Sequence, residues 1–126
     1  MNLKEIKKKE LLRFLIGGGS ATLVDFTLYR LLVWAGLGLS PSKAVSYITG
    51  AAVGFLINKF WTFERKTLSG TEVLRYILLY AGSACANTLV NKLVIEITGL
   101  YFLAYLFATG VSTVINFLGQ KFFVFR

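Results

Sequence analysis

Five ionisable side chains lie inside long apolar stretches of this 126-residue chain. They are Asp25, Arg30, Lys59, Lys92 and Lys121. A charge near the centre of a bilayer costs roughly 2.5–3.5 kcal/mol on insertion scales, so such residues are functional candidates. Arginine and lysine bind phosphate strongly where the dielectric constant is low. Four cations and one acid therefore predict a ligand with an anionic head and an apolar tail, for which a lipid phosphate is suitable.

Carboxamides accompany these charges inside the apolar stretches. They are Asn58, Asn87, Asn116 and Gln120. Amides in a bilayer also form hydrogen bonds between helices, so packing within a helical bundle is the alternative to ligand binding. Lys59 and Lys121 have an alternative as well, because long cationic side chains near the end of a span can extend to the membrane surface.

The composition narrows the class of protein. Hydrophobic residues make up 56% of the chain and charged residues only 16%, which is below the ~25% of a typical soluble domain. There is no histidine and the one cysteine is Cys85, so we expect no catalytic site, no metal and no cofactor. The net charge is +8, and the basic residues that produce it lie at the ends of apolar stretches. This pattern is typical of membrane topology and not of nucleic-acid binding.

Four apolar stretches predict an all-α membrane protein with four transmembrane helices. They cover about residues 11–35, 41–63, 73–97 and 101–125. Each is long enough to cross a ~30 Å hydrocarbon core, and backbone groups in lipid must be paired within each segment. Pro41 is placed to open the second helix, and Thr71 followed by Glu72 indicates the start of the third.

The basic residues predict the orientation in the membrane. They cluster before the first stretch, in the linker after the second and at the end of the fourth: Lys4, Lys7, Lys8, Lys9, Arg13, Arg65, Lys66, Arg75, Lys121 and Arg126. The opposite side has only Lys43, which we expect in a loop. By the positive-inside rule, both termini lie on the cytoplasmic side of the inner membrane.

An internal repeat is visible when the sequence is shifted by 62 residues, which lays residues 13–64 on 75–126. Asp25 then matches Asn87, Arg30 matches Lys92, and Lys59 matches Lys121. Each copy holds two spans, so we predict parallel repeats of a helical hairpin within one domain, 1–126. Small residues four apart, such as Ser46, Gly50 and Gly54, form stripes that favour close helix packing. Since a bundle of four helices is narrow, we expect a homodimer with these stripes as candidate interfaces.

Two motifs resemble those of the GtrA-like family. Residues 13–18 (RFLIGG) resemble its RF-x-x-VGG opening, and residues 55–63 (FLINKFWTF) resemble its NF-x-x-N-[KR]-x-W-[TV]-F motif. Residues 116–125 are similar to a second copy of that motif. This chain departs from the family pattern at Gly54, where the family often has asparagine, and at Gln120.

The resemblance implies a flippase that moves a polyprenyl-phosphate-linked sugar, or another anionic lipid, between membrane leaflets during polysaccharide synthesis. In that interpretation Lys59 and Lys121 gather the phosphate at the inner side, and Arg30 and Lys92 receive it at the outer side. The amides Asn58, Asn116 and Gln120 bind phosphate or sugar hydroxyls. Asp25 and Asn87 lie between the two pairs of cations.

Two alternatives remain open at this stage. A non-transporting protein could anchor a membrane glycosyltransferase through its helical grooves or its basic linker. A small multidrug exporter also has four spans, but such proteins rely on a glutamate in the first span, where this chain has Asp25.

Overall fold

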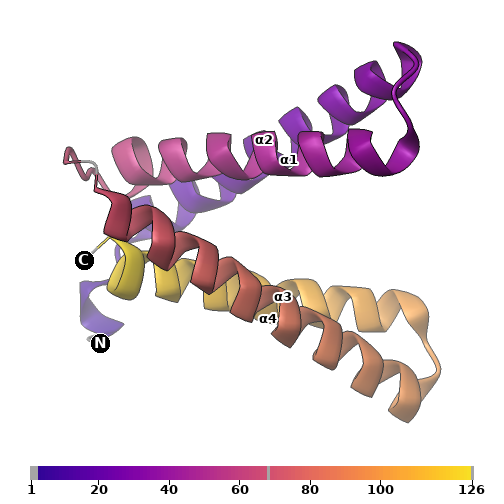
Figure 1. The fold of residues 1–126 in the computed structure, drawn as a ribbon. Helices are drawn as coiled ribbons and strands as arrows, with labels where there is room; N and C mark the ends of the chain where they lie inside the picture. The colour runs from indigo at the N-terminus through magenta and orange to yellow at the C-terminus, as the bar shows by residue number, and fades with distance from the viewer. Residues whose placement is uncertain (1–2, 68, 126) are drawn as a thin grey trace. The chain divides into compact units, whose positions relative to one another are not determined.

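The computed structural model describes residues 3–67 and 69–125, and this part of the chain is entirely helical outside its turns (Figure 1). The elements are η1 (Leu3–Glu5), α1 (Lys8–Trp34), α2 (Leu39–Ile57), η2 (Asn58–Thr62), α3 (Gly70–Thr98), α4 (Tyr101–Gly119) and η3 (Gln120–Val124). The predicted all-α class is confirmed for these residues. Leu68 of the predicted linker and Arg126 of the predicted cytoplasmic cations lie outside the described residues.

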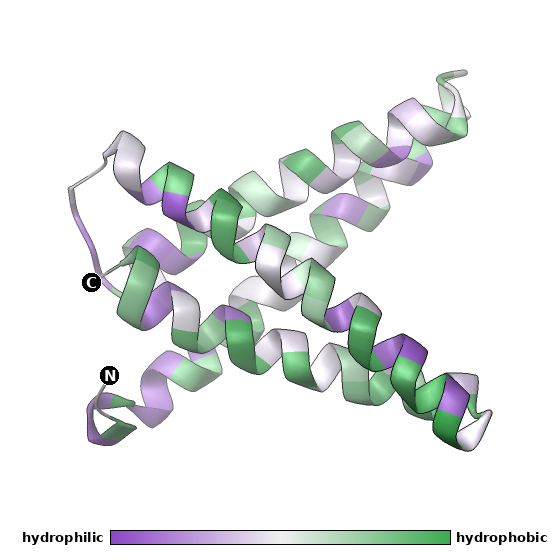
Figure 2. Ribbon diagram, turned by 60° about the horizontal axis from the view of Figure 1, so that its bottom comes forward, coloured by the Kyte–Doolittle hydropathy of each residue, from purple (hydrophilic) through white to green (hydrophobic). Residues whose placement is uncertain are grey.

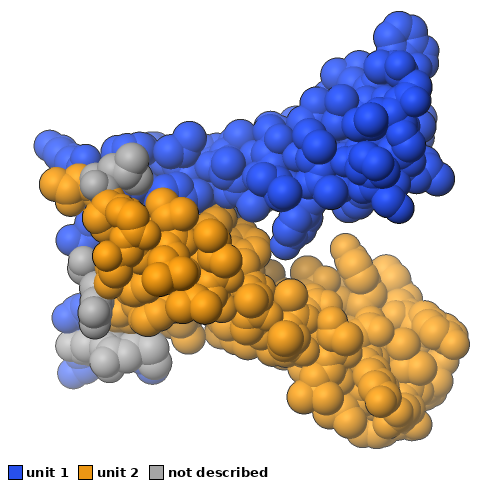
Figure 3. All heavy atoms as spheres, in the orientation of Figure 1, with its two compact units in different colours: residues 1–66 blue, residues 67–126 orange. Residues whose placement is uncertain are grey.

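Two compact units divide the chain, one of residues 1–66 and one of residues 67–126 (Figure 3). Within the first unit α1 packs against α2 and η2, and within the second α3 packs against α4 and η3. Small residues allow close contact between the helices. Ser42, Ser46, Gly50 and Gly54, spaced by four, are buried on α2, as are Ala104 and Ala108 on α4.

The turns and caps differ from the sequence prediction by a few residues. Ser69 caps the N-terminus of α3, because its hydroxyl accepts a hydrogen bond from the Glu72 amide at 3.2 Å. The predicted start at Thr71 was therefore wrong by one residue, since α3 begins at Gly70. Gly99 ends α3 with φ of 71°, a left-handed conformation that glycine adopts without steric cost.

Within the described residues, three helical segments are long and apolar enough to cross a membrane. They are α1, α3 and the continuous stretch of α4 with η3, Tyr101–Val124. The four helices carry hydrophobic residues on several sides, as expected where lipid surrounds them (Figure 2). The helix α2 is not among the three segments, and its first turns contain Ser40, Pro41, Ser42 and Lys43. The prediction that it is a fourth span stays a prediction.

One close contact between helices in each unit involves a glycine and a large side chain, at positions that the predicted repeat would match. In the first unit, a Cβ added at Gly17 would lie 3.0 Å from Cγ2 of Ile57. In the second unit, a Cβ added at Gly119 would collide with the side chain of Leu79. Gly17 and Leu79 are 62 residues apart, as are Ile57 and Gly119. The large residue is thus on the second helix in one hairpin and on the first helix in the other.

Candidate functional site

The predicted inner-side residues lie in π-helical turns, which the sequence analysis did not anticipate. Asn58 and Lys59 open η2, and Gln120 and Lys121 open η3, each continuing from the preceding α-helix. A π-helical turn is rare, and it is found frequently at functional sites. Hydrophobic periodicity does not separate a single π-turn from an α-turn, so charge, amide groups and the motif marked these residues in the sequence, but nothing there indicated their conformation.

The side chains that open η2 are withdrawn from the surface. Lys59 is fully buried and its ammonium lies 5.6 Å from the centroid of the Phe60 ring, within the range of a cation–π contact. Asn58 is buried as well, and its Oδ1 accepts a hydrogen bond from Thr62 at 2.9 Å. Burial of Lys59 argues against the alternative in which it extends to the membrane surface.

The second unit repeats this arrangement with an amide one carbon longer. Gln120 is fully buried, and Lys121 is half-buried with its ammonium 5.7 Å from the centroid of the Phe122 ring. Both units thus place an amide and an adjacent lysine at the end of their second helix. A cation beside an amide can bind a phosphate or sulfate oxygen through charge-assisted hydrogen bonds.

An arginine from the facing helix secures each π-helical end. In the first unit, Nη1 of Arg13 donates to the Trp61 carbonyl at 2.8 Å and to Glu64 Oε1 at 3.1 Å. The guanidinium also lies 4.9 Å from the centroid of a Trp61 ring. In the second unit, Nη2 of Arg75 donates to the Val124 carbonyl at 3.3 Å. In the sequence both arginines indicate topology, and Arg13 also opens the motif of residues 13–18, but neither pattern predicts these contacts.

A carboxylate joins this contact in the first unit. Lys9 pairs with Glu64 at 2.8 Å, and this hydrogen bond and charge lower the pKa of the exposed Glu64 carboxyl. The residue 62 positions later is Arg126, so the second hairpin has no acid at the matching place in the sequence.

The deep acid Asp25 is paired within its own hairpin. Its Oδ2 lies 2.9 Å from the ammonium of Lys43, and its Oδ1 accepts a 2.6 Å hydrogen bond from the Ser46 hydroxyl. The prediction that Lys43 lies in a loop was wrong. The helix α2 begins at Leu39, with Pro41 inside its first turn where a missing N–H does no harm, so Lys43 is helical.

Neutral groups occupy the place in the second unit that the predicted repeat would match to this pair. Asn87 donates from Nδ2 to the Ser112 hydroxyl at 3.1 Å, and the Ser83 hydroxyl donates to the Ser112 carbonyl at 3.3 Å. Asn116 lies one turn further along α4, and its buried Oδ1 accepts no hydrogen bond from any residue that the structure describes. This oxygen remains available to a ligand donor such as a sugar hydroxyl.

The predicted outer-side cations are exposed on the first helix of each unit. Arg30 lies on α1 and Lys92 on α3. Lys92 forms no ion pair with Glu96, four residues later, in the described part of the chain. Because Arg30 and Lys92 belong to different units, their joint action stays a prediction.

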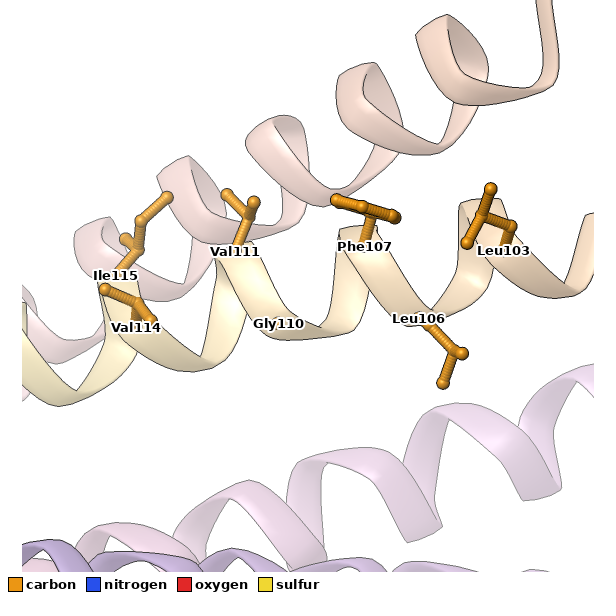
Figure 4. A pocket seen from close by; sticks show the side chains of 7 residues that line it. All are labelled: Leu103, Leu106, Phe107, Gly110, Val111, Val114 and Ile115. Carbon is orange, nitrogen blue, oxygen red and sulfur yellow. The ribbon is translucent and has the colours of Figure 1, made fainter. Parts of the chain in front are cut away.

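An apolar hollow lies along α4 (Figure 4). It is lined by Leu103, Leu106, Phe107, Gly110, Val111, Val114 and Ile115. No polar side chain lines it, so it has no group that could bind a phosphate or a sugar hydroxyl. Among the described residues no group of three or more His, Cys, Asp or Glu side chains could hold a metal ion.

Comparison with known proteins gives one family and one relative. The family described as "GtrA/DPMS, transmembrane domain" matches residues 13–125. A protein of Bacillus subtilis (strain 168) named "Uncharacterized membrane protein YngA" is 29% identical over 126 residues, which cover 99% of this chain and 84% of that protein. No solved structure matches the chain.

Proposed function

Because the chain belongs to the GtrA/DPMS transmembrane-domain family, we propose that it moves a polyprenyl-phosphate-linked sugar, or the polyprenyl phosphate itself, across the cytoplasmic membrane. Membership makes it a membrane protein and indicates a role in polysaccharide or glycosylation pathways. Domains of this kind are typically non-catalytic, and our expectation that this chain is not an enzyme stays a prediction.

The observation that carries the proposal is the full burial of Lys59 together with the burial of Asn58, its neighbour in the sequence. A cation held in a low-dielectric surrounding binds a phosphate far more strongly than one in water. Lys121 with Gln120 would supply the same pair of groups from the second unit. Each pair forms a proposed site for the head group at the cytoplasmic end of its own unit, and Asn116 contributes a free acceptor in the second unit.

A proposed exit residue lies toward the turn of each hairpin. Arg30 and Lys92 are exposed cations there, and they suit a phosphate that has left the inner site. Asp25 and Asn87 lie between the inner and outer cations along their helices. The polyprenyl tail stays in lipid, where it needs no protein contact.

The proposed architecture has four spans in two parallel repeats. The bounds of α2 and η2, shifted by 62 residues, coincide with those of α4 and η3. With η2 included, α2 is as long as the α4–η3 segment, which supports its role as the fourth span. Both termini are then cytoplasmic, and a homodimer would supply the width that a head group needs.

The opposite sizes at Gly17/Ile57 and Leu79/Gly119 provide a test of the repeat. Gly17→Leu alone should destabilise the protein by about 1–3 kcal/mol through overpacking, because its side chain would strike Ile57 and Asn58. Adding Ile57→Gly recreates the arrangement of the second unit and should recover at least half of that loss. Thermal unfolding in detergent measures both variants. If the double variant unfolds earlier than either single one, the two positions are not equivalent.

The test of the function is transfer by the purified chain alone. Vesicles containing the protein and a short-chain polyprenyl-phosphate-linked hexose are exposed to periodate, which does not cross the membrane. We expect the protein to make the inner-leaflet lipid accessible within minutes, while protein-free vesicles keep about half of it protected. Protection that persists in the presence of folded protein would reject the proposal.

The anchoring alternative makes a different prediction in the same experiment. A chain that transfers no lipid, yet co-purifies with a glycosyltransferase and raises its yield, would serve as a membrane partner. The exporter alternative is weakened by the ion pair of Asp25 with Lys43. An acid already neutralised by a lysine lacks the open negative charge that an organic cation requires.

A further inference from the structure

We infer that Lys43 is an anion-binding residue that Asp25 keeps occupied until a phosphate displaces the carboxylate. The ligand class rests on the proposed function, which supplies a phosphate with a polyprenyl tail. The geometry of the pair rests on the first hairpin alone. In the sequence Lys43 is a lone cation beside a turn, and this position alone does not indicate a binding role.

The two members of the pair differ in accessibility. The Lys43 side chain is 58% exposed, whereas that of Asp25 is 18% exposed and Ser46 is fully buried. An incoming anion therefore reaches the ammonium from the open side without unfolding the hairpin. The ammonium has three donors, and Asp25 accepts one of them at 2.9 Å.

The carboxylate retains a partner after Lys43 leaves. Ser46 donates to Oδ1, whereas Lys43 contacts Oδ2, so the 2.6 Å bond to Ser46 is independent of the ion pair. The phosphate monoester of a polyprenyl phosphate carries up to two charges and three acceptor oxygens, against one charge and two oxygens for the carboxylate. Competition for the ammonium thus favours the phosphate over the internal acid.

The second hairpin indicates that packing does not need these charges. There the residue matching Asp25 is Asn87, and it closes the helix pair through a neutral bond to Ser112. The residue matching Lys43 is Tyr105, which carries no charge. The second hairpin thus closes without an ion pair, so packing alone does not require Asp25 and Lys43 in the first hairpin. Because the Lys43 side chain is exposed, the pair is suited to controlling anion binding by Lys43.

The test measures the affinity of the purified protein for farnesyl phosphate, with farnesol and inorganic phosphate as separate probes. Asp25→Asn keeps the shape and an acceptor for Ser46 but releases Lys43, so we expect about tenfold tighter binding of farnesyl phosphate. Lys43→Gln should weaken binding about tenfold, and the double variant should match Lys43→Gln. Glu5→Gln and Lys66→Gln make the same changes in net charge at exposed positions, and neither should alter the affinity.

The outcomes separate this inference from the proposed function. If the wild-type protein transfers lipid but folded Asp25→Asn binds farnesyl phosphate no more tightly, the inference on Lys43 is wrong and the function stands. If Asp25→Asn binds more tightly but the wild-type protein transfers no lipid, the inference on Lys43 stands and the proposed function is wrong. Should Asp25→Asn fail to fold, undiminished binding by Lys43→Gln overturns the inference. If inorganic phosphate binds as tightly as farnesyl phosphate, the assignment to a lipid is overturned. If farnesol binds as tightly as farnesyl phosphate, recognition of the charge is overturned.

Discussion

Replacing Arg30 and Lys92 together with alanine is expected to abolish transfer of a polyprenyl-phosphate-linked sugar by the reconstituted protein. Each side chain would contribute a charge-assisted hydrogen bond to the phosphate, worth about 1.5–3 kcal/mol. Each single substitution should therefore slow transfer about tenfold or more, and the double substitution at least a hundredfold. The measurement is the initial rate at which vesicle lipid becomes accessible to periodate.

The control for this double variant removes two cations elsewhere. Arg65 and Lys66 are exposed in the segment after the first hairpin, so Arg65→Ala with Lys66→Ala makes the same change in net charge away from the proposed exit residues. Transfer by this control should stay within about twofold of the wild-type rate, since exposed charges contribute little to a distant site under screening by salt. A normal rate in both double variants would remove Arg30 and Lys92 from the mechanism.

The largest loss of stability is expected from Gly50→Val, which should cost about 3 kcal/mol or more. A Cβ at this position would lie 2.8 Å from the carbonyl oxygen of Ala21 and 3.1 Å from Cβ of Asp25. The first of these contacts is backbone, so α1 and α2 would have to separate. Separation also carries Asp25 away from Ser46, and the polar pair loses its short hydrogen bond. The midpoint of thermal unfolding in detergent reports this change.

A second glycine provides the matched control. A Cβ added at Gly82, in the middle of α3, would meet no other atom within 4 Å. Gly82→Ala should leave stability unchanged or raise it by up to about 1 kcal/mol through helix propensity. Equal losses in Gly50→Val and Gly82→Ala would mean that close contact at Gly50 does not hold the first hairpin together.

Much of the fold follows from the sequence because lipid restricts the possible structures. Long apolar stretches must be helices where no water is available to the backbone, and the predicted helix bounds lie within a few residues of those observed. The exact starts were less predictable. Pro41 fits any position in the first turn, so the true start at Leu39 was missed by two residues. Lys43 was assigned to a loop although it follows Pro41, the predicted start of this helix.

The candidate site was predictable as a set of residues but not as an arrangement. The motif identified Asn58 and Lys59, whereas the π-helical turn that presents them leaves no trace in hydrophobic spacing. The pairing of Asp25 with Lys43 depends on how two helices align across a turn, and a shift of one residue in α2 would have placed Lys43 elsewhere on the helix. The contacts of Arg13 with Trp61 and Glu64 were missed for the same reason.

The opposite sizes at the two helix contacts have a consequence for assembly in the membrane. If α1 met α4, Gly17 would face Gly119 and leave a gap, and if α3 met α2, Leu79 would oppose Ile57 and hold the helices apart. Both mismatched helix pairs would lose van der Waals contact, which is the main attraction between helices in lipid. We therefore expect each helix to fit best against its neighbour in the chain at these positions, so that each hairpin can form without exchanging helices with the other.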